Sequence, residues 1–278
     1  MKFYLKLKPK EKVVVVIPIH KGNPTDYELI SFEQCYKVLA KHPILIVAPK
    51  GLNVTAYKER IDHIHVIYIP KHWQSSLQSY NTLKKSHFFY TLLKDYEYIL
   101  TYELDAFVFR DDLLMWCNKG YDYIGAPWFD KLGGADLNSE MLGVGNSGFS
   151  LRKTQTIHKY ISRYVHKSKR YYSYNPFIKL LGMGEYYLGH VNKLLGINYS
   201  VEKFCHEPED MLICFKLKKQ FPSIQIAPLE DAWRFAFEFN PRLLYQLSQE
   251  ELPFGCHAWW KYDLEFWKPY IRSFGYSL

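Results

Sequence analysis

The sequence has few cysteines and no long apolar segment. Its five cysteines are odd in number and widely spaced, and no C-x-x-C pair occurs among them. This pattern argues against a disulfide scaffold and favours a reducing compartment. The longest purely apolar run, VVVVIPI (13–19), is far too short to span a bilayer. The first residues lack the apolar region and cleavage site of a signal peptide, so we expect a cytoplasmic protein.

Two common nucleotide-binding signatures are also missing. The glycine-rich stretch GVGNSGFSL (143–151) has no G-K-[ST] after it and does not match G-x-G-x-x-G. It is therefore neither a P-loop nor a dinucleotide-binding loop. The chain also shows no internal repeat, no low-complexity segment and no clear linker. The simplest interpretation is one domain over residues 1–278.

Positive charge and aromatic residues are abundant. Lys and Arg number 36 against 28 Asp and Glu, which gives a formal charge of +8, and 24 tyrosines raise the aromatic share to 18%. An excess of positive charge favours anionic partners: nucleotides, nucleic acid or an anionic membrane face. Net charge alone does not choose among them, and the sequence carries no signal for an oligomeric state.

Strand and helix patterns alternate in the first half of the chain. Strands are predicted at 13–19, 43–49, 63–70 and 96–102, and helices at 28–40 and 77–96. This alternation indicates parallel βαβ units in a Rossmann-type sheet flanked by helices. In such sheets ligands bind at the carboxyl ends of the strands.

The second half is less regular. The pattern predicts a strand running into a loop at 121–129, a glycine-rich turn and strand at 143–153, a helix at 207–221 and a strand at 223–228. Residues 154–205 are basic, rich in tyrosine and mostly helical in pattern, so we expect them to form a helical insertion. Such a segment can contact an anionic membrane, although a solvated basic helix face is the commoner explanation. We do not expect a nucleic-acid partner.

The stretch YILTYELDAFVF (98–109) ends a predicted buried strand with two carboxylates, Glu103 and Asp105. Residues separated by one position in extended backbone point the same way. Two converging carboxylates are a natural site for Mg²⁺ or Mn²⁺. The alternative is a pair of solvated acids, or partners of the neighbouring Arg110.

Six segments follow one another along the chain: VVVVIPIHK, YELDAFVF, YDYIGAPW, GNSGFSLRK, PEDMLICFKL and FGCHAWWK. In this order they resemble the GT-A glycosyltransferases, and more narrowly a bacterial group known as the DUF5672 glycosyltransferase-like domain. The resemblance spans roughly residues 13–152 and 205–260 and leaves the insertion uncovered. It implies a GT-A-like mixed sheet with a nucleotide-binding half over 13–110 and an acceptor and donor-sugar half over 111–278.

The resemblance implies a role for several of these carboxylates. Glu103 and Asp105 would be the D-x-D element, which holds a divalent cation against a nucleotide-sugar diphosphate, with Glu in place of the usual first Asp. Asp210 is similar to the catalytic base of inverting GT-A enzymes, and Glu209 beside it would bind acceptor or donor hydroxyls. Asp210 and Glu209 also fit an ordinary acidic helix N-terminus, which remains the alternative.

The resemblance also implies residues that contact the donor. Asn146, Ser147 and Gly148 would face the donor sugar, the alternative being a tight hairpin turn. The other positions, which would line the nucleotide pocket or stack on sugar, are His20, Lys21, Asn81, Lys84, Trp128, Trp259 and Trp260.

His257 would be a third metal ligand, because some GT-A enzymes use a C-terminal His in that role. One alternative is a His stacked among tryptophans. Another is a Cys₂His₂ zinc site built from Cys205-His206 and Cys256-His257, although that spacing matches no standard finger.

We therefore expect a metal-dependent, inverting glycosyltransferase. It would move a sugar from a nucleotide-diphosphate donor, most simply a UDP-sugar, to a hydroxyl of a bacterial surface glycan such as lipopolysaccharide or capsule, free or lipid-linked. Work on such an acceptor would suit the inner face of the cytoplasmic membrane. The rival functions are a sugar nucleotidyltransferase, a non-catalytic glycan-binding protein on a degenerate transferase fold, and a basic membrane- or nucleic-acid-associated protein without catalysis.

Overall fold

The computed structural model describes residues 11–131, 139–194 and 199–278. The remaining stretches, including the first ten residues and the part of the predicted insertion at 195–198, lie outside the described residues. The strands are β1 (Glu11–Pro18), β2 (Ile44–Pro49), β3 (His65–Ile69), β4 (Tyr96–Tyr102), β5 (Phe107–Val108), β6 (Tyr123–Ile124), β7 (Pro127–Phe129), β8 (Met141–Val144), β9 (Phe149–Lys153), β10 (Ala236–Phe237) and β11 (Gly255–Cys256). The helices are α1 (Asp26–Leu39), α2 (Thr55–Lys58), η1 (Lys71–Gln74), α3 (Leu77–Lys84), α4 (His87–Leu92), α5 (Leu113–Asn118), α6 (Thr154–Arg163), η3 (Lys169–Tyr172), α7 (Pro176–Leu194), α8 (Tyr199–Phe204), α9 (Glu209–Met211), η4 (Leu212–Leu217), α10 (Lys218–Gln220), α11 (Leu229–Phe235), α12 (Pro241–Leu247) and α13 (Leu264–Ser273).

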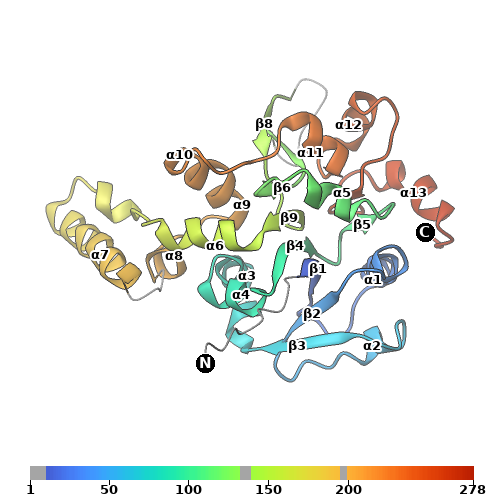
Figure 1. Ribbon diagram of the computed structural model, residues 1–278, viewed down its shortest axis with the longest axis horizontal. Coiled ribbons are helices and arrows are strands. Elements are labelled where there is room, and N and C mark those ends of the chain that lie inside the picture. The colour runs from blue at the N-terminus through green and yellow to red at the C-terminus, as the bar shows by residue number, and fades with distance from the viewer. Residues whose placement is uncertain (1–10, 132–138, 195–198) are drawn as a thin grey trace, which may run out of the picture.

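The main sheet of the described residues has the strand order β3-β2-β1-β4-β9-β6 (Figure 1). Strands β1 to β4 run parallel, and β9 runs antiparallel to both β4 and β6. The sequence-based prediction of a Rossmann-type mixed sheet flanked by helices, with a helical insertion, is thereby confirmed.

The apolar run in β1 explains why this strand lies inside the sheet. Val13, Val15 and Ile17 pack on one face with α1 and α5, whereas Val14 and Val16 pack on the other face with α3, α4 and α6. Side chains alternate between the faces of a strand, so a strand covered on both sides must be apolar at every position. This places the carboxyl ends of β1 and β4 side by side.

Two predicted elements differ from the structure. The expected helix at 77–96 is broken into α3 and α4, because Ser86 caps the second helix by accepting from Phe89 N. The break also lets the buried Lys85 donate to the carbonyl oxygens of Cys205 and Glu207. The strand predicted at 223–228 is wrong: only an isolated bridge between Tyr123 and Ile226 forms there.

The insertion forms α6, η3, α7 and α8, and the described part of it is mostly helical as predicted. In Figure 1, α7 and α8 lie at the opposite end of the molecule from the C-terminus. None of the described helices is long and apolar enough to cross a membrane.

All five cysteines are buried and free of disulfides. Cys35 and Cys117 lie in the core on the α1 side of the sheet, and Cys205 and Cys214 lie in the core on the α4 side. Cys256 belongs to a separate aromatic core near the C-terminus. The absence of a disulfide scaffold agrees with the sequence pattern.

Candidate metal and nucleotide site

The turn after β4 presents the two carboxylates predicted to bind metal. Glu103 N donates to Gly148 O (2.8 Å) and Ala106 N donates to Glu103 O (2.9 Å), which fixes the turn. The Tyr102 hydroxyl lies within hydrogen-bond distance of the carbonyl oxygens of Ser31 and Ala106 and so links the turn to α1. The turn therefore lies at the carboxyl edge of the sheet, where parallel α/β sheets bind ligands.

A small second sheet, in the order β10-β11-β5, brings His257 to these carboxylates. In β11, Cys256 pairs with Phe107 of β5 and with Phe237 of β10, and His257 follows directly. His257 N donates to Phe237 O (2.9 Å), so Glu238 lies beside the ring. Three segments distant in sequence thus meet at one point.

The structure brings Glu103, Asp105 and His257 together as predicted. His257 Nε2 lies 2.9 Å from Asp105 Oδ1 and 3.7 Å from Glu103 Oε2. His257 Nδ1 lies 2.8 Å from Glu238 Oε1. One ligand atom from each of the three residues lies within 4.8 Å of the others, and no other such group occurs among the described residues.

The chemistry of this group fits a divalent cation. The buried Nε2 of His257 makes no hydrogen bond of normal geometry although Asp105 is close. Nδ1 faces the Glu238 carboxylate, which would keep the proton on Nδ1 when a cation displaces the proton on Nε2. Two carboxylate oxygens and one imidazole nitrogen are donors that Mn²⁺ accepts well.

Electrostatics hold the carboxylates ionised. Burial raises the pKa of Glu103, but the Lys84 ammonium and His257 outweigh it and leave the pKa at about 2. Burial likewise opposes ionisation of Asp105, yet His257 and Lys261 lower its pKa below the ordinary value. Burial lowers the pKa of His257, and the surrounding carboxylates more than reverse this, so its pKa is well above the usual value.

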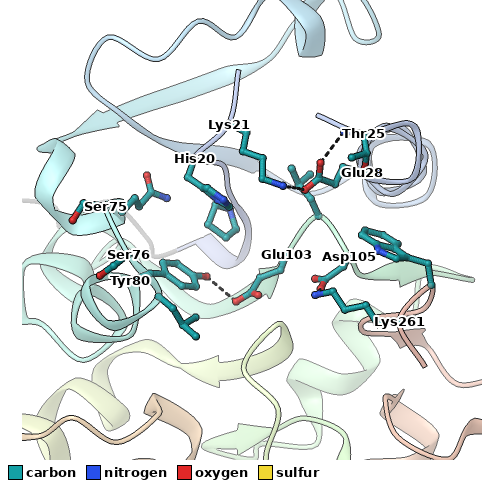
Figure 2. A pocket seen from close by; sticks show the side chains of 15 residues that line it. His20, Lys21, Thr25, Glu28, Ser75, Ser76, Tyr80, Glu103, Asp105 and Lys261 are labelled. Carbon is teal, nitrogen blue, oxygen red and sulfur yellow. Dashed lines mark hydrogen bonds and ion pairs between the residues drawn. The ribbon is translucent and has the colours of Figure 1, made fainter. Parts of the chain in front are cut away.

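A cavity of about 600 Å³ opens beside the carboxylates. Figure 2 shows its lining: His20 and Lys21 come from the end of β1, Tyr80 comes from α3, and Glu103 and Asp105 form the floor. Lys21 donates to Glu28 (3.1 Å), whose carboxylate also caps α1 through Thr25 N. The structure therefore brings the predicted His20 and Lys21 into the same cavity as the metal-ligand candidates.

Lys84 is placed behind the cavity and does not line it. Its side chain is 2% exposed and donates to Glu103 Oε1 (3.2 Å) and Ser147 Oγ (2.7 Å). The Tyr80 hydroxyl donates to the same Glu103 oxygen (2.9 Å). These donors hold Glu103 in place. Asn81, which was also predicted to line the nucleotide pocket, is half-buried on α3 and is not part of the cavity lining.

The 143–148 loop lies against the metal-ligand candidates. A Cβ on Gly148 would lie 2.0 Å from His257 Nε2, so the imidazole occupies the space that a side chain would need. Asn146 has a φ of 59° and its Oδ1 accepts from Gly148 N (2.9 Å), which shapes the turn. Trp128 packs on Gly145 instead of facing the cavity. Contact of this loop with a donor sugar stays a prediction.

The acidic pair at the start of α9 is buried. Asp210 is 5% exposed and accepts from Met211 N (2.9 Å). Burial and the neighbouring Glu209 raise the pKa of Asp210 to about 6, although Lys84 opposes this. Glu209 is fully buried in an ion pair with Arg152, and neither Glu209 nor Asp210 belongs to the lining of the cavity.

Three residues around the site were not found from the sequence. Glu238 orients His257, Lys261 donates to Asp105 Oδ2 (2.6 Å), and Tyr80 donates to Glu103. Lys261 is the last residue of the motif FGCHAWWK and could have been found there. Glu238 lies in the apolar stretch FAFEFNP, and the only sequence feature that indicated a functional role was an acidic residue among apolar ones.

One sequence-based prediction, stacking of Trp259 on a sugar, and one alternative, the Cys₂His₂ zinc site, fail. Trp259 is fully buried, and its indole nitrogen donates to Ser31 Oγ, so it cannot stack on a sugar. Trp260 does line the cavity. The Cys₂His₂ alternative has no support, because among the described residues the one group that could hold a metal ion is Glu103, Asp105 and His257.

Fold and site together define an α/β protein with a candidate divalent-cation centre beside a cavity at the carboxyl edge of its sheet. The profile of the family described as "Protein of unknown function (DUF5672)" matches residues 63–257. That stretch covers more than half of the chain and includes all three metal-ligand candidates. The chain belongs to this family.

Three glycosyltransferases are among the solved structures to which this chain is similar. Mouse xyloside xylosyltransferase 1 is 10% identical, with 88% of this chain and 97% of that chain covered and a TM-score of 0.48. The galactosyltransferase LgtC, solved with donor and acceptor sugar analogues, is 12% identical, with 94% and 95% covered and a TM-score of 0.44. GlyE of Streptococcus pneumoniae is 12% identical, with 95% and 63% covered and a TM-score of 0.43. No curated protein matches the sequence.

Proposed function

We propose that this protein is a metal-dependent, inverting glycosyltransferase that uses a nucleotide-diphosphate sugar. The acceptor would be a hydroxyl of a bacterial surface glycan, free or lipid-linked, and the work would take place in the cytoplasm. The observation that carries the proposal is the convergence of Glu103, Asp105 and His257, because Glu103 and Asp105 also line a cavity that holds His20 and Lys21. A cavity of about 600 Å³ falls within the range of small-molecule sites.

In this proposal the cation would be Mn²⁺ or Mg²⁺ on Glu103, Asp105 and His257. When bound, it would offset the charge that builds on the diphosphate as the anomeric C–O bond breaks. The protein's own residues prepare that position: Glu238 orients His257, while Lys84 and Tyr80 fix Glu103.

Donor binding would divide between the two ends of the cavity. His20 and Lys21, at the end of β1, would meet the base and ribose of the nucleotide, most simply a uridine. Lys261 is half-exposed beside Asp105 and would add positive charge facing the diphosphate. Ser147 and Gly148 lie behind His257 and would approach the donor sugar through backbone.

Asp210 would take the proton from the acceptor hydroxyl as that oxygen attacks the anomeric carbon on the face opposite the diphosphate. A base works best when its pKa lies near the operating pH, and the pKa of Asp210 is raised to about 6 by burial and by Glu209. At neutral pH the carboxylate is ionised and can accept the proton. Glu209 would act through Asp210, since its own carboxylate is paired with Arg152.

The test is calorimetric titration of UDP, GDP and CMP, each with and without Mn²⁺. We expect one diphosphate to bind only with the metal, and Asp105→Asn to abolish that binding. Asp62→Asn is the matched control, because Asp62 is an exposed acid that does not line the cavity. A donor screen with the selected nucleotide then identifies the sugar.

Other results would replace the proposal. Failure of every nucleotide to bind would leave Glu103 and Asp105 with a structural role and would favour a glycan-binding protein. Binding of a nucleoside triphosphate with a sugar phosphate, and release of pyrophosphate, would favour the nucleotidyltransferase. Binding unchanged in Asp105→Asn would remove the metal centre from the mechanism.

A further inference from the structure

Helix α7 exposes a continuous apolar stripe to solvent. The stripe consists of Phe177, Leu180, Leu181, Leu188, Val191 and Leu194, which are between 47% and 88% exposed. Their spacing of three, four and seven residues places them on one side of the helix. An amphipathic helix of a globular protein ordinarily turns this side toward the core, so the outward orientation calls for a partner.

The opposite side of α7 explains why the stripe faces outward. A Cβ on Gly182 would lie 2.2 Å from Tyr171 N, and a Cβ on Gly189 would lie 2.8 Å from the Ser200 Cβ. The helix is therefore packed through its glycines, with backbone in close approach to η3 and α8. Glu185 also turns inward, where it binds Arg170 (2.7 Å) and Ser168 (2.6 Å). No acidic side chain of α7 remains free on the outer side.

The surroundings of the stripe are strongly basic. Residues 154–204 contain eight Lys and Arg against two Glu, so most of the net charge of +8 belongs to this segment. Lys169 and Arg170 of η3 and Lys179 of α7 are exposed. Tyr172 and Tyr174, just before α7, are 66% and 105% exposed. Tyrosines of this kind are common at the boundary between apolar chains and headgroups.

We propose that α7 docks on the surface of an anionic lipid bilayer, with the stripe among the acyl chains and the basic residues against the headgroups. Apolar burial and attraction to anionic lipid are the two components of interfacial helix binding. A second copy of the chain fits less well, because it would bring an equally basic surface against this one. The helix lies in the interface plane, consistent with the finding that no described helix can span a membrane.

The test is flotation of the full chain with vesicles of phosphatidylcholine, with and without phosphatidylglycerol. We expect binding to the anionic vesicles that weakens with salt. The variant Leu181→Glu/Leu188→Glu should lower the partition coefficient by about tenfold or more. The charge-matched control is Leu114→Glu/Met115→Glu on α5, where the two side chains are 48% and 43% exposed, against 47% for both stripe residues. This control should bind nearly as wild type.

A second variant, Leu181→Ser/Leu188→Ser, separates apolar loss from added negative charge and should also weaken binding. Equal binding of this variant and wild type would overturn the proposal, as would failure of wild type to bind. A lipid-free dimer that dissociates in both stripe variants would assign the stripe to a second copy instead. No nucleotide takes part in this experiment, so its outcome is independent of the transferase proposal.

Discussion

The substitution Gly148→Ala tests the candidate metal centre without replacing any of the ligand candidates. The added Cβ would lie 2.0 Å from His257 Nε2, whereas ordinary contact begins near 3.4 Å. The imidazole must therefore retreat by about 1.5 Å, and metal–ligand distances tolerate only about 0.2 Å. The φ of Gly148 is not in the left-handed region, so alanine fits the backbone itself.

We expect Gly148→Ala to weaken Mn²⁺ binding by about 10–100-fold, the loss typical when the support of a ligand is removed. Electron paramagnetic resonance of Mn²⁺ measures this directly, because the signal of the free ion disappears on binding. Gly184→Ala is the matched control: a Cβ there meets nothing within 4 Å.

A double variant shows whether the effect passes through the imidazole. If it does, Gly148→Ala/His257→Gln should bind Mn²⁺ no more weakly than His257→Gln alone, since residues in contact are not additive. Additive losses would mean that Gly148 acts by another route. Wild-type affinity in a folded Gly148→Ala variant would refute the placement of His257 among the ligands.

Two further predictions concern the buried acids beside the site. Arg152→Met should lower the free energy of unfolding by about 3–5 kcal/mol in urea denaturation, because it leaves the charge of Glu209 buried and unpaired. The double variant Arg152→Met/Glu209→Met should recover most of this stability. Equal losses in both variants would contradict the reasoning. Asp210→Asn should abolish transfer, yet it should stabilise the protein at pH 8 by about 3 kcal/mol. The reason is that the pKa of Asp210 in the folded protein, about 6, exceeds the ordinary value of 3.8. Wild type therefore loses folding stability as the pH rises from about 4 through 6 and the buried carboxyl group ionises. The gain should vanish at pH 3, and wild-type transfer should fall about tenfold per pH unit well below pH 6; a stability gain independent of pH would assign the effect to packing.

The local sequence pattern predicted where the metal-ligand candidates Glu103 and Asp105 lie, but it predicted less well which residues surround them. The strand ending at Tyr102 and the spacing of Glu103 and Asp105 are local features, and the rule for parallel sheets supplies the edge where they lie. His257 was predicted by resemblance alone. Its approach depends on β11 pairing with β5, a contact between segments far apart in sequence.

The residues that support the ligands were harder to predict. Lys84 and Lys85 are adjacent in sequence, but their side chains have different partners because α3 ends between them. Lys84 binds Glu103, whereas Lys85 binds the carbonyl oxygens of Cys205 and Glu207. The role of Glu238 follows from its strand register with β11, and no local pattern encodes that register. Burial of Glu209 likewise depends on Arg152, which the hydrophobic pattern of β9 gave no reason to expect.

The positions of the cysteines allow thiol labelling to detect local unfolding in different parts of the molecule. Burial raises the pKa of the Cys35, Cys214 and Cys256 thiols well above the ordinary value and that of Cys117 to about 12. Only the thiolate reacts with an alkylating reagent, so each thiol is silent until its surroundings open. Because the five thiols divide among three separate cores, mass spectrometry of a timed labelling series would give the order in which those cores come apart.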